Sequence, residues 1–83
     1  MTQADRIRDF VKSNYIDPAR AKGQDTVSVR SGDVHSAMSL SQRYPAVCSA
    51  LGSNKFEQLC NIERLSIEGP INGANTVYKY RLL

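Results

Sequence analysis

A turn-rich segment near the C-terminus restricts the fold of this chain more than any other feature. Residues 69–75 read GPINGAN, and two glycines, a proline and two asparagines in seven residues are typical of a turn. Apolar and polar residues alternate in the second half of residues 62–68 and again over residues 76–82. Two such segments around a turn predict a β-hairpin with a long polar tip.

Each strand of this hairpin presents apolar side chains on one face. Leu65 and Ile67 share a face of the first strand, and Tyr78, Tyr80 and Leu82 share a face of the second. Tyrosines can also stack on the bases of single-stranded nucleic acid, but Tyr78 and Tyr80 share their face with Leu82, which favours a role in the core.

The first half of the chain carries a helical pattern. Thr2 is followed three residues later by Asp5, as in a capping box, and apolar residues then recur on one helix face. A helix is predicted over residues 3–15. Pro18 is expected to end it, and residues 19–23 form at most a short turn.

A short strand and a second helix follow. Residues 26–29 are mostly β-branched and alternate, which predicts a strand with Val27 and Val29 facing inward. Ser31 can cap a helix over residues 32–39.

Two further helical segments precede the hairpin. Residues 40–42 are a predicted tight connection, after which Pro45 occupies the first turn of a helix that runs to Leu51. A last short helix is predicted over residues 55–60, with Asn61 as its stop.

The chain has 83 residues, which suits one domain with one core. Cys48 and Cys60 lie in apolar helical patterns, so core packing is favoured over a disulfide or a metal site. Charges interrupt the N-terminal segment and no apolar run is long enough to span a membrane, so a cytoplasmic location without membrane contact is expected.

The predicted order is helix, short strand, helix, tight turn, helix, short helix and hairpin. Across residues 1–83 this order resembles the winged helix-turn-helix family, an α+β fold. The resemblance implies duplex DNA as the partner. Residues 43–51 would enter the major groove, residues 32–39 would brace them across the backbone, and the hairpin tip at 69–76 would touch an adjacent groove or phosphates.

The net charge of +3 is modest but uneven. Residues 18–55 carry +3 and residues 70–83 carry +2, whereas residues 1–17 balance and residues 56–69 carry −2. The positive charge therefore lies in the segments that the resemblance assigns to DNA.

The helix over residues 43–51 supplies the principal candidates for base contacts. Its pattern places Gln42, Ala46, Ser49 and Ser53 on a small, polar outer side. Arg43 can donate two hydrogen bonds to guanine and Gln42 can pair with adenine. Base contact is favoured, and the alternative is that both are ordinary solvated residues at a helix start.

Further candidates are expected to contact the sugar-phosphate backbone. Ser53, Asn54 and Lys55 lie at a predicted helix start, where Ser53 can alternatively be a simple cap. The others flank the hairpin tip or the second helix, and turn formation alone explains both asparagines; they are Asn72, Asn75, Lys79, Arg30 and His35.

The pattern favours a DNA-binding module, either a small transcriptional regulator or an accessory DNA-recognition domain. A protein-interaction module, as a homodimer or a docking domain, is the alternative, and RNA is a possible partner. A single histidine and the lack of clustered titratable residues argue against an enzyme, a metal site or a cofactor.

Overall fold

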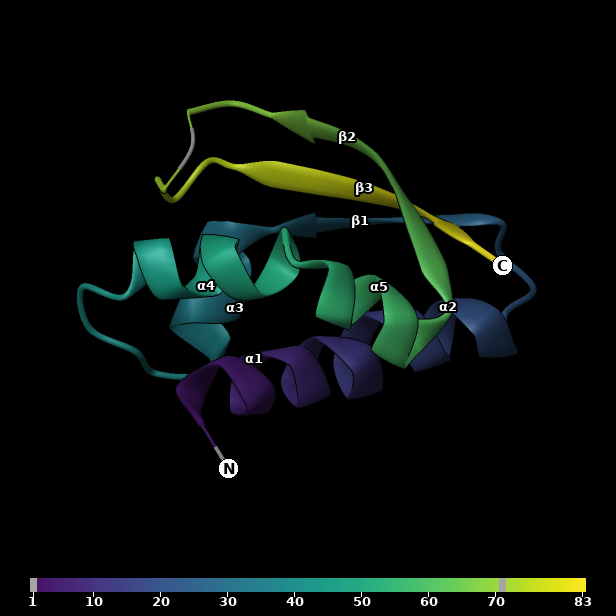
Figure 1. The fold of residues 1–83 in the computed structure, drawn as a ribbon, viewed down its shortest axis with the longest axis horizontal. Coiled ribbons are helices and arrows are strands. Elements are labelled where there is room, and N and C mark those ends of the chain that lie inside the picture. The colour runs from purple at the N-terminus through teal and green to yellow at the C-terminus, as the bar shows by residue number, and fades with distance from the viewer. Residues whose placement is uncertain (1, 71) are drawn as a thin grey trace.

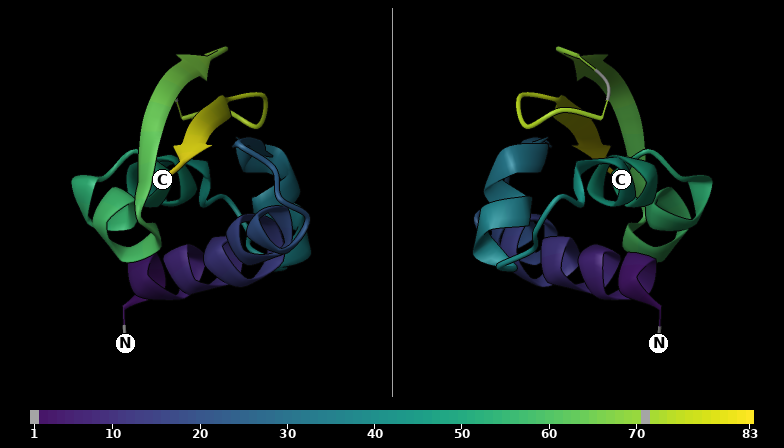
Figure 2. Two further views of the ribbon diagram at one scale, coloured as in Figure 1. Left: turned by 90° about the vertical axis from the view of Figure 1, so that its right-hand side faces the viewer. Right: turned by 90° about the vertical axis from the view of Figure 1, so that its left-hand side faces the viewer.

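The computed structural model describes residues 2–70 and 72–83. Helices pack on one side of a three-stranded antiparallel sheet, which confirms the α+β class (Figures 1 and 2). The elements, in chain order, are α1 Gln3–Val11, η1 Lys12–Ile16, α2 Asp17–Ala21, β1 Thr26–Arg30, α3 Ser31–Ala37, α4 Tyr44–Leu51, α5 Asn54–Cys60, β2 Ile62–Glu68 and β3 Val77–Leu82.

The first helix begins as predicted and ends later. The capping box is confirmed: Thr2 Oγ1 accepts from the Asp5 N–H at 3.2 Å, and the Asp5 carboxylate accepts from the Thr2 N–H. The predicted stop at Pro18 is wrong, because the chain passes through the π-helical η1 into α2. In η1 the Asp17 N–H donates to the Lys12 carbonyl, five residues back. This change of partner places Pro18 in a first turn, where its missing N–H is tolerated.

The start of α3 differs from the prediction. Ser31 was expected to cap the helix, but Arg30 occupies the N-cap position and the Ser31 side chain is fully buried. Its hydroxyl donates to the Gly73 carbonyl at 2.5 Å. Ser31 therefore attaches the β2–β3 connection to the start of α3, because the pairing of β1 with β3 brings these two segments together.

The link between α3 and α4 is longer than predicted. It covers residues 38–43 instead of residues 40–42, and Ser39 and Gln42 adopt positive φ angles of 55° and 52°. Pro45 lies in the first turn of α4, and Asn61 ends α5 in the left-handed conformation, as expected.

The sheet has the strand order β1-β3-β2. The regular alternation predicted for the first hairpin strand is wrong, because the β2 ladder shifts between Arg64 and Ser66, which pair with Tyr80 and Lys79. Leu65 has no partner at this irregularity, and it stays 43% exposed while Ile67 is 38% exposed. A bulge of this kind changes the direction of nearby side chains.

Two tyrosines of β3 join the sheet to α4. Tyr78 and Tyr80 are buried, which confirms their predicted core role. The Tyr78 hydroxyl donates to the Cys48 carbonyl at 3.1 Å, and the Tyr80 hydroxyl donates to the Leu51 carbonyl at 2.6 Å. Cys48 and Cys60 are both buried free thiols in the same core, as expected.

The close approach of α3 to the β2–β3 connection gives a first prediction. A Cβ on Gly32 would lie 2.6 Å from the Ala74 carbonyl oxygen, which belongs to the backbone. We expect Gly32→Ala to lower the free energy of unfolding by about 1–3 kcal/mol, as overpacking does. Urea denaturation measures this loss. Gly73→Ala is the matched control in the same connection, since its Cβ would meet ordinary contacts at 3.5 Å. Equal losses in both variants would contradict the proposed clash.

Candidate nucleic-acid interface

The start of α4 is exposed but firmly positioned. Gln42 and Arg43 are both exposed, and the Arg43 backbone N–H donates to Nε2 of His35 at 3.1 Å. The imidazole stacks on the Tyr44 ring at a centroid distance of 4.0 Å. His35 is only 7% exposed, so its predicted contact with the nucleic-acid backbone is wrong. Its ring instead joins α3 to the first turn of α4.

The outer side of α4 carries small side chains. Pro45 and Ser49 are exposed and Ala46 is half-buried, whereas the opposite side of the helix is in the core. A shallow hollow lies at the first turn, lined by Gln3, Gln42, Arg43, Pro45 and Ala46. The surface along Pro45, Ala46 and Ser49 is therefore made of short side chains.

Arg30 and Asn75 bind each other. Arg30 Nη2 donates to Asn75 Oδ1 at 2.7 Å, and Arg30 Nη1 lies 2.9 Å from the carboxylate of Asp33. Both side chains are thus bonded within the protein, and their phosphate contacts stay a prediction. The bonds within the protein hold the β2–β3 connection against the start of α3.

The start of α5 lies away from the start of α4 and from the β2–β3 connection. The Ser53 hydroxyl accepts from the Phe56 N–H and from Arg8 Nε, and donates to the Ala50 carbonyl, so the capping alternative holds for this residue. Asn54 follows it and is exposed. Figure 1 shows α5 beyond the far end of α4 from the β2–β3 connection.

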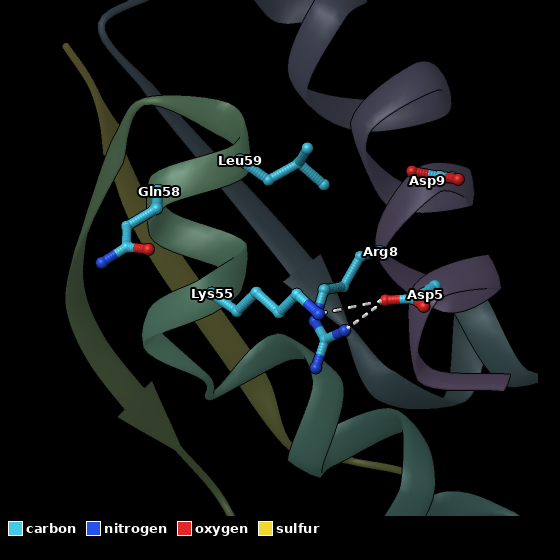
Figure 3. Close-up of a pocket in the computed structure, with 6 residues that line it drawn as sticks. All are labelled: Asp5, Arg8, Asp9, Lys55, Gln58 and Leu59. Atoms are coloured by element: carbon cyan, nitrogen blue, oxygen red, sulfur yellow. Dashed lines mark hydrogen bonds and ion pairs between the residues drawn. The ribbon is translucent and has the colours of Figure 1, made fainter. Parts of the chain in front are cut away.

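Lys55 faces acidic residues of α1. Its Nζ lies 3.7 Å from an Asp5 carboxylate oxygen, which also pairs with Arg8. Figure 3 shows these side chains around a hollow between α1 and α5, with Asp9 and Leu59 on its other sides. Hydrogen bonds from Thr2 lower the pKa of Asp5 and keep it charged. A phosphate at Lys55 would meet these carboxylates.

The remaining predicted residues fall on different faces. Lys79 is exposed on the sheet face away from the tyrosines, with Nζ 4.0 Å from Glu68. Asn72 is exposed with a φ of 65° and lines a hollow together with Ser49. The structure thus gathers Gln42, Arg43, Ser49 and Asn72 along α4 and beside the β2–β3 connection, and Figure 2 shows this end of the molecule. It does not bring Lys79 or the start of α5 to them.

Sequence reasoning missed Arg64. This side chain lines the hollow with Ser49 and Asn72, and its Nη1 donates to the Gly52 carbonyl at 2.6 Å. In the sequence Arg64 belongs to a segment with net negative charge. In the structure it pairs with Tyr80, two residues after buried Ile62, so it lies on the sheet face that packs against the helices.

The cations differ in how they are paired. Six of the eleven lysines and arginines lie within 4.0 Å of a side-chain carboxylate oxygen; these are Arg8, Lys12, Arg30, Lys55, Lys79 and Arg81. Within residues 2–70 and 72–83, no side-chain carboxylate pairs with the other five, which are Arg6, Arg20, Lys22, Arg43 and Arg64. Of these, Arg43 and Arg64 lie beside α4. These two guanidinium groups therefore contribute an uncompensated positive charge beside the outer side of α4.

Among the described residues, no three histidine, cysteine or acidic side chains come close enough together to hold a metal ion. None of the helices that the structure describes combines the length and the apolar character that a membrane span requires. Comparison of the chain with protein-family models, with curated proteins and with solved structures finds no match in any of the three.

Proposed function

We propose that the protein binds duplex DNA as a winged helix-turn-helix module. The outer side of α4 faces the major groove, α3 braces it, and the β2–β3 connection lies against the sugar-phosphate backbone. The element order, the packing of α3 on α4 through His35 and Tyr44, and the sheet order β1-β3-β2 all support this arrangement. A small transcriptional regulator or the DNA-recognition part of a larger assembly fits this function.

The main support for the proposal is the composition of the surface around the start of α4. Arg43 is exposed there without a carboxylate partner among the described residues, and Gln42 precedes it. Behind them the helix presents only Pro45, Ala46 and Ser49. A guanidinium can make two hydrogen bonds to a guanine edge, and short neighbouring side chains let the helix approach the floor of the groove.

The experiment is a binding titration with a fluorescent mixed-sequence duplex at low and near-physiological salt. Arg43→Ala is expected to weaken binding by about 1–3 kcal/mol, or roughly 5- to 150-fold, because it removes a contact to a base edge. Affinity of the wild type is expected to fall steeply with salt, as phosphate contacts require.

Lys22→Ala is the matched control. Lys22 is an exposed cation at the end of α2, and Figure 1 shows α2 and α4 at opposite ends of the fold. Its removal is expected to change the affinity less than about twofold, since it loses only long-range attraction. Equal losses in the two variants would contradict a specific role for α4. If the wild-type protein does not bind duplex DNA at low salt, a protein-interaction module becomes the favoured function.

A further inference from the structure

A second hollow lies farther along the outer side of α4, between this helix and β2. Ser49 of α4, Arg64 and Ile67 of β2, and Asn72 of the β2–β3 connection line it. Cys48, Gly52 and Tyr78 complete the lining. The hollow thus places a cation, a hydroxyl and an amide from three different segments beside the exposed apolar side chain of Ile67. Ser49 and Asn72 are exposed, and Ile67 is 38% exposed.

Arg64 is held at this hollow by α4 itself. Its Nη1 donates to the carbonyl of Gly52, the residue that ends α4, at 2.6 Å. A guanidinium has five N–H donors, so this single bond leaves most of them for a ligand. In the part of the chain that the structure describes, no carboxylate oxygen forms an ion pair with it within 4.0 Å.

We propose that Arg64, Ser49 and Asn72 bind one phosphodiester group of the DNA backbone, with its deoxyribose against Ile67. This inference rests on the proposed function and adds a contact to it. Arginine forks match phosphate oxygens with two parallel hydrogen bonds, and hydroxyl and amide donors are frequent partners of the same oxygens. The apolar Ile67 side chain suits the carbon face of the sugar.

The position of Arg64 fits the proposed approach of α4. Arg43 precedes the first turn of the helix, and Arg64 is bonded to the residue after its last turn. Eight residues of α-helix span about 12 Å, which is close to the width of the major groove. The helix that enters the groove therefore has one unpaired cation at each end, and the two play different roles, base contact and backbone contact.

The test measures duplex affinity against salt concentration for Arg64→Gln, Arg64→Lys and Arg81→Gln. Arg64→Gln is expected to weaken binding at least fivefold for every duplex sequence and to reduce the salt slope by about one ion. Arg64→Lys should restore the slope and only part of the affinity, because an ammonium lacks the planar fork. Arg81 is the control cation, paired with Glu63 on the opposite sheet face, and its removal should change the affinity less than twofold.

An NMR measurement on the Arg64 side chain distinguishes a direct contact with DNA from an indirect effect of Arg64 on the structure of α4. The Nε–H resonance of Arg64 in the labelled wild type is expected to shift when duplex is added, while that of Arg81 stays in place. This inference would be overturned if a folded Arg64→Gln variant kept the affinity and the salt slope of the wild type. It would also be overturned if the Arg64 resonance did not shift on addition of duplex. Neither outcome would affect the result for Arg43. No wild-type binding to duplex DNA would overturn both proposals. Tighter binding of an RNA duplex would overturn the assignment to DNA.

Discussion

Phe56→Ala is expected to lower the free energy of unfolding by about 3–5 kcal/mol. Phe56 is fully buried, and its ring meets the Tyr80 ring edge-on at a centroid distance of 5.4 Å. The substitution removes these contacts and leaves a cavity where α5 meets the sheet. Because small domains have total stabilities of about 5–15 kcal/mol, this loss is a large fraction of the whole. Urea denaturation followed by circular dichroism measures it.

Leu59→Ala is the matched control on the same helix. Leu59 is 46% exposed, so its truncation is expected to cost less than about 1 kcal/mol. Alanine is a better helix former than either leucine or phenylalanine, so helix propensity does not account for a loss in either variant. Equal losses for Leu59 and Phe56 would mean that α5 does not pack with the side that the structure buries.

Alkaline pH is expected to destabilise the protein strongly. Burial raises the pKa of Tyr80 far above its usual value, and burial together with the hydrogen bond to Cys48 does the same for Tyr78. In the unfolded chain both titrate near pH 10. Their contribution to stability is therefore complete below about pH 10 and is lost as the pH rises toward the raised values. Burial also raises the pKa of the Cys60 thiol to about 11, which acts in the same direction.

The size of this effect follows from the linkage of protonation to folding. Each buried tyrosine costs up to about 1.4 kcal/mol per pH unit above 10, so the pair costs about 4 kcal/mol at pH 11.5. Urea denaturation between pH 8 and 11.5 measures the loss. Tyr78→Phe should remove about half of the tyrosine contribution, roughly 2 kcal/mol at pH 11.5, while the contribution of Cys60 remains. If absorbance at 295 nm shows all four tyrosines ionised near pH 10 while the circular dichroism stays native, the hydroxyls are not buried as described.

Local signals in the sequence were sufficient for part of the fold. The capping box at Thr2, Pro45 in a first turn and the stop at Asn61 depend on a few neighbouring residues. The burial of Tyr78 and Tyr80 follows from simple alternation. Such features need no knowledge of the rest of the chain.

Other features depend on contacts between distant segments. The helix continues past Pro18 because a π-helical turn changes the backbone partners, while Ile16 and Ala19 become buried in the core. Ser31 does not cap α3, because its hydroxyl donates a hydrogen bond to the carbonyl of Gly73, which is distant in the sequence. Periodicity and propensity do not contain this information.

The candidate site shows the same division. Helical periodicity correctly gave the outward position of Ser49, and Gln42 and Arg43 are exposed as expected. Periodicity did not show that Arg30 is bonded to Asp33 and Asn75, or that Lys55 lies 3.7 Å from Asp5 of α1. Arg64 was missed because summing charge along a segment does not show which carboxylates meet which cations in space.

The bonds between the start of α3 and the β2–β3 connection also bear on how the chain folds. Ser31 and Arg30 reach Gly73 and Asn75 across more than 40 residues of sequence, and β1 completes the sheet by pairing with β3. Closing such long loops costs chain entropy before any contact is gained. The connection beside α4 is therefore expected to acquire its shape late, after α3 has docked. A peptide of the two C-terminal strands alone would lack the anchors that shape it.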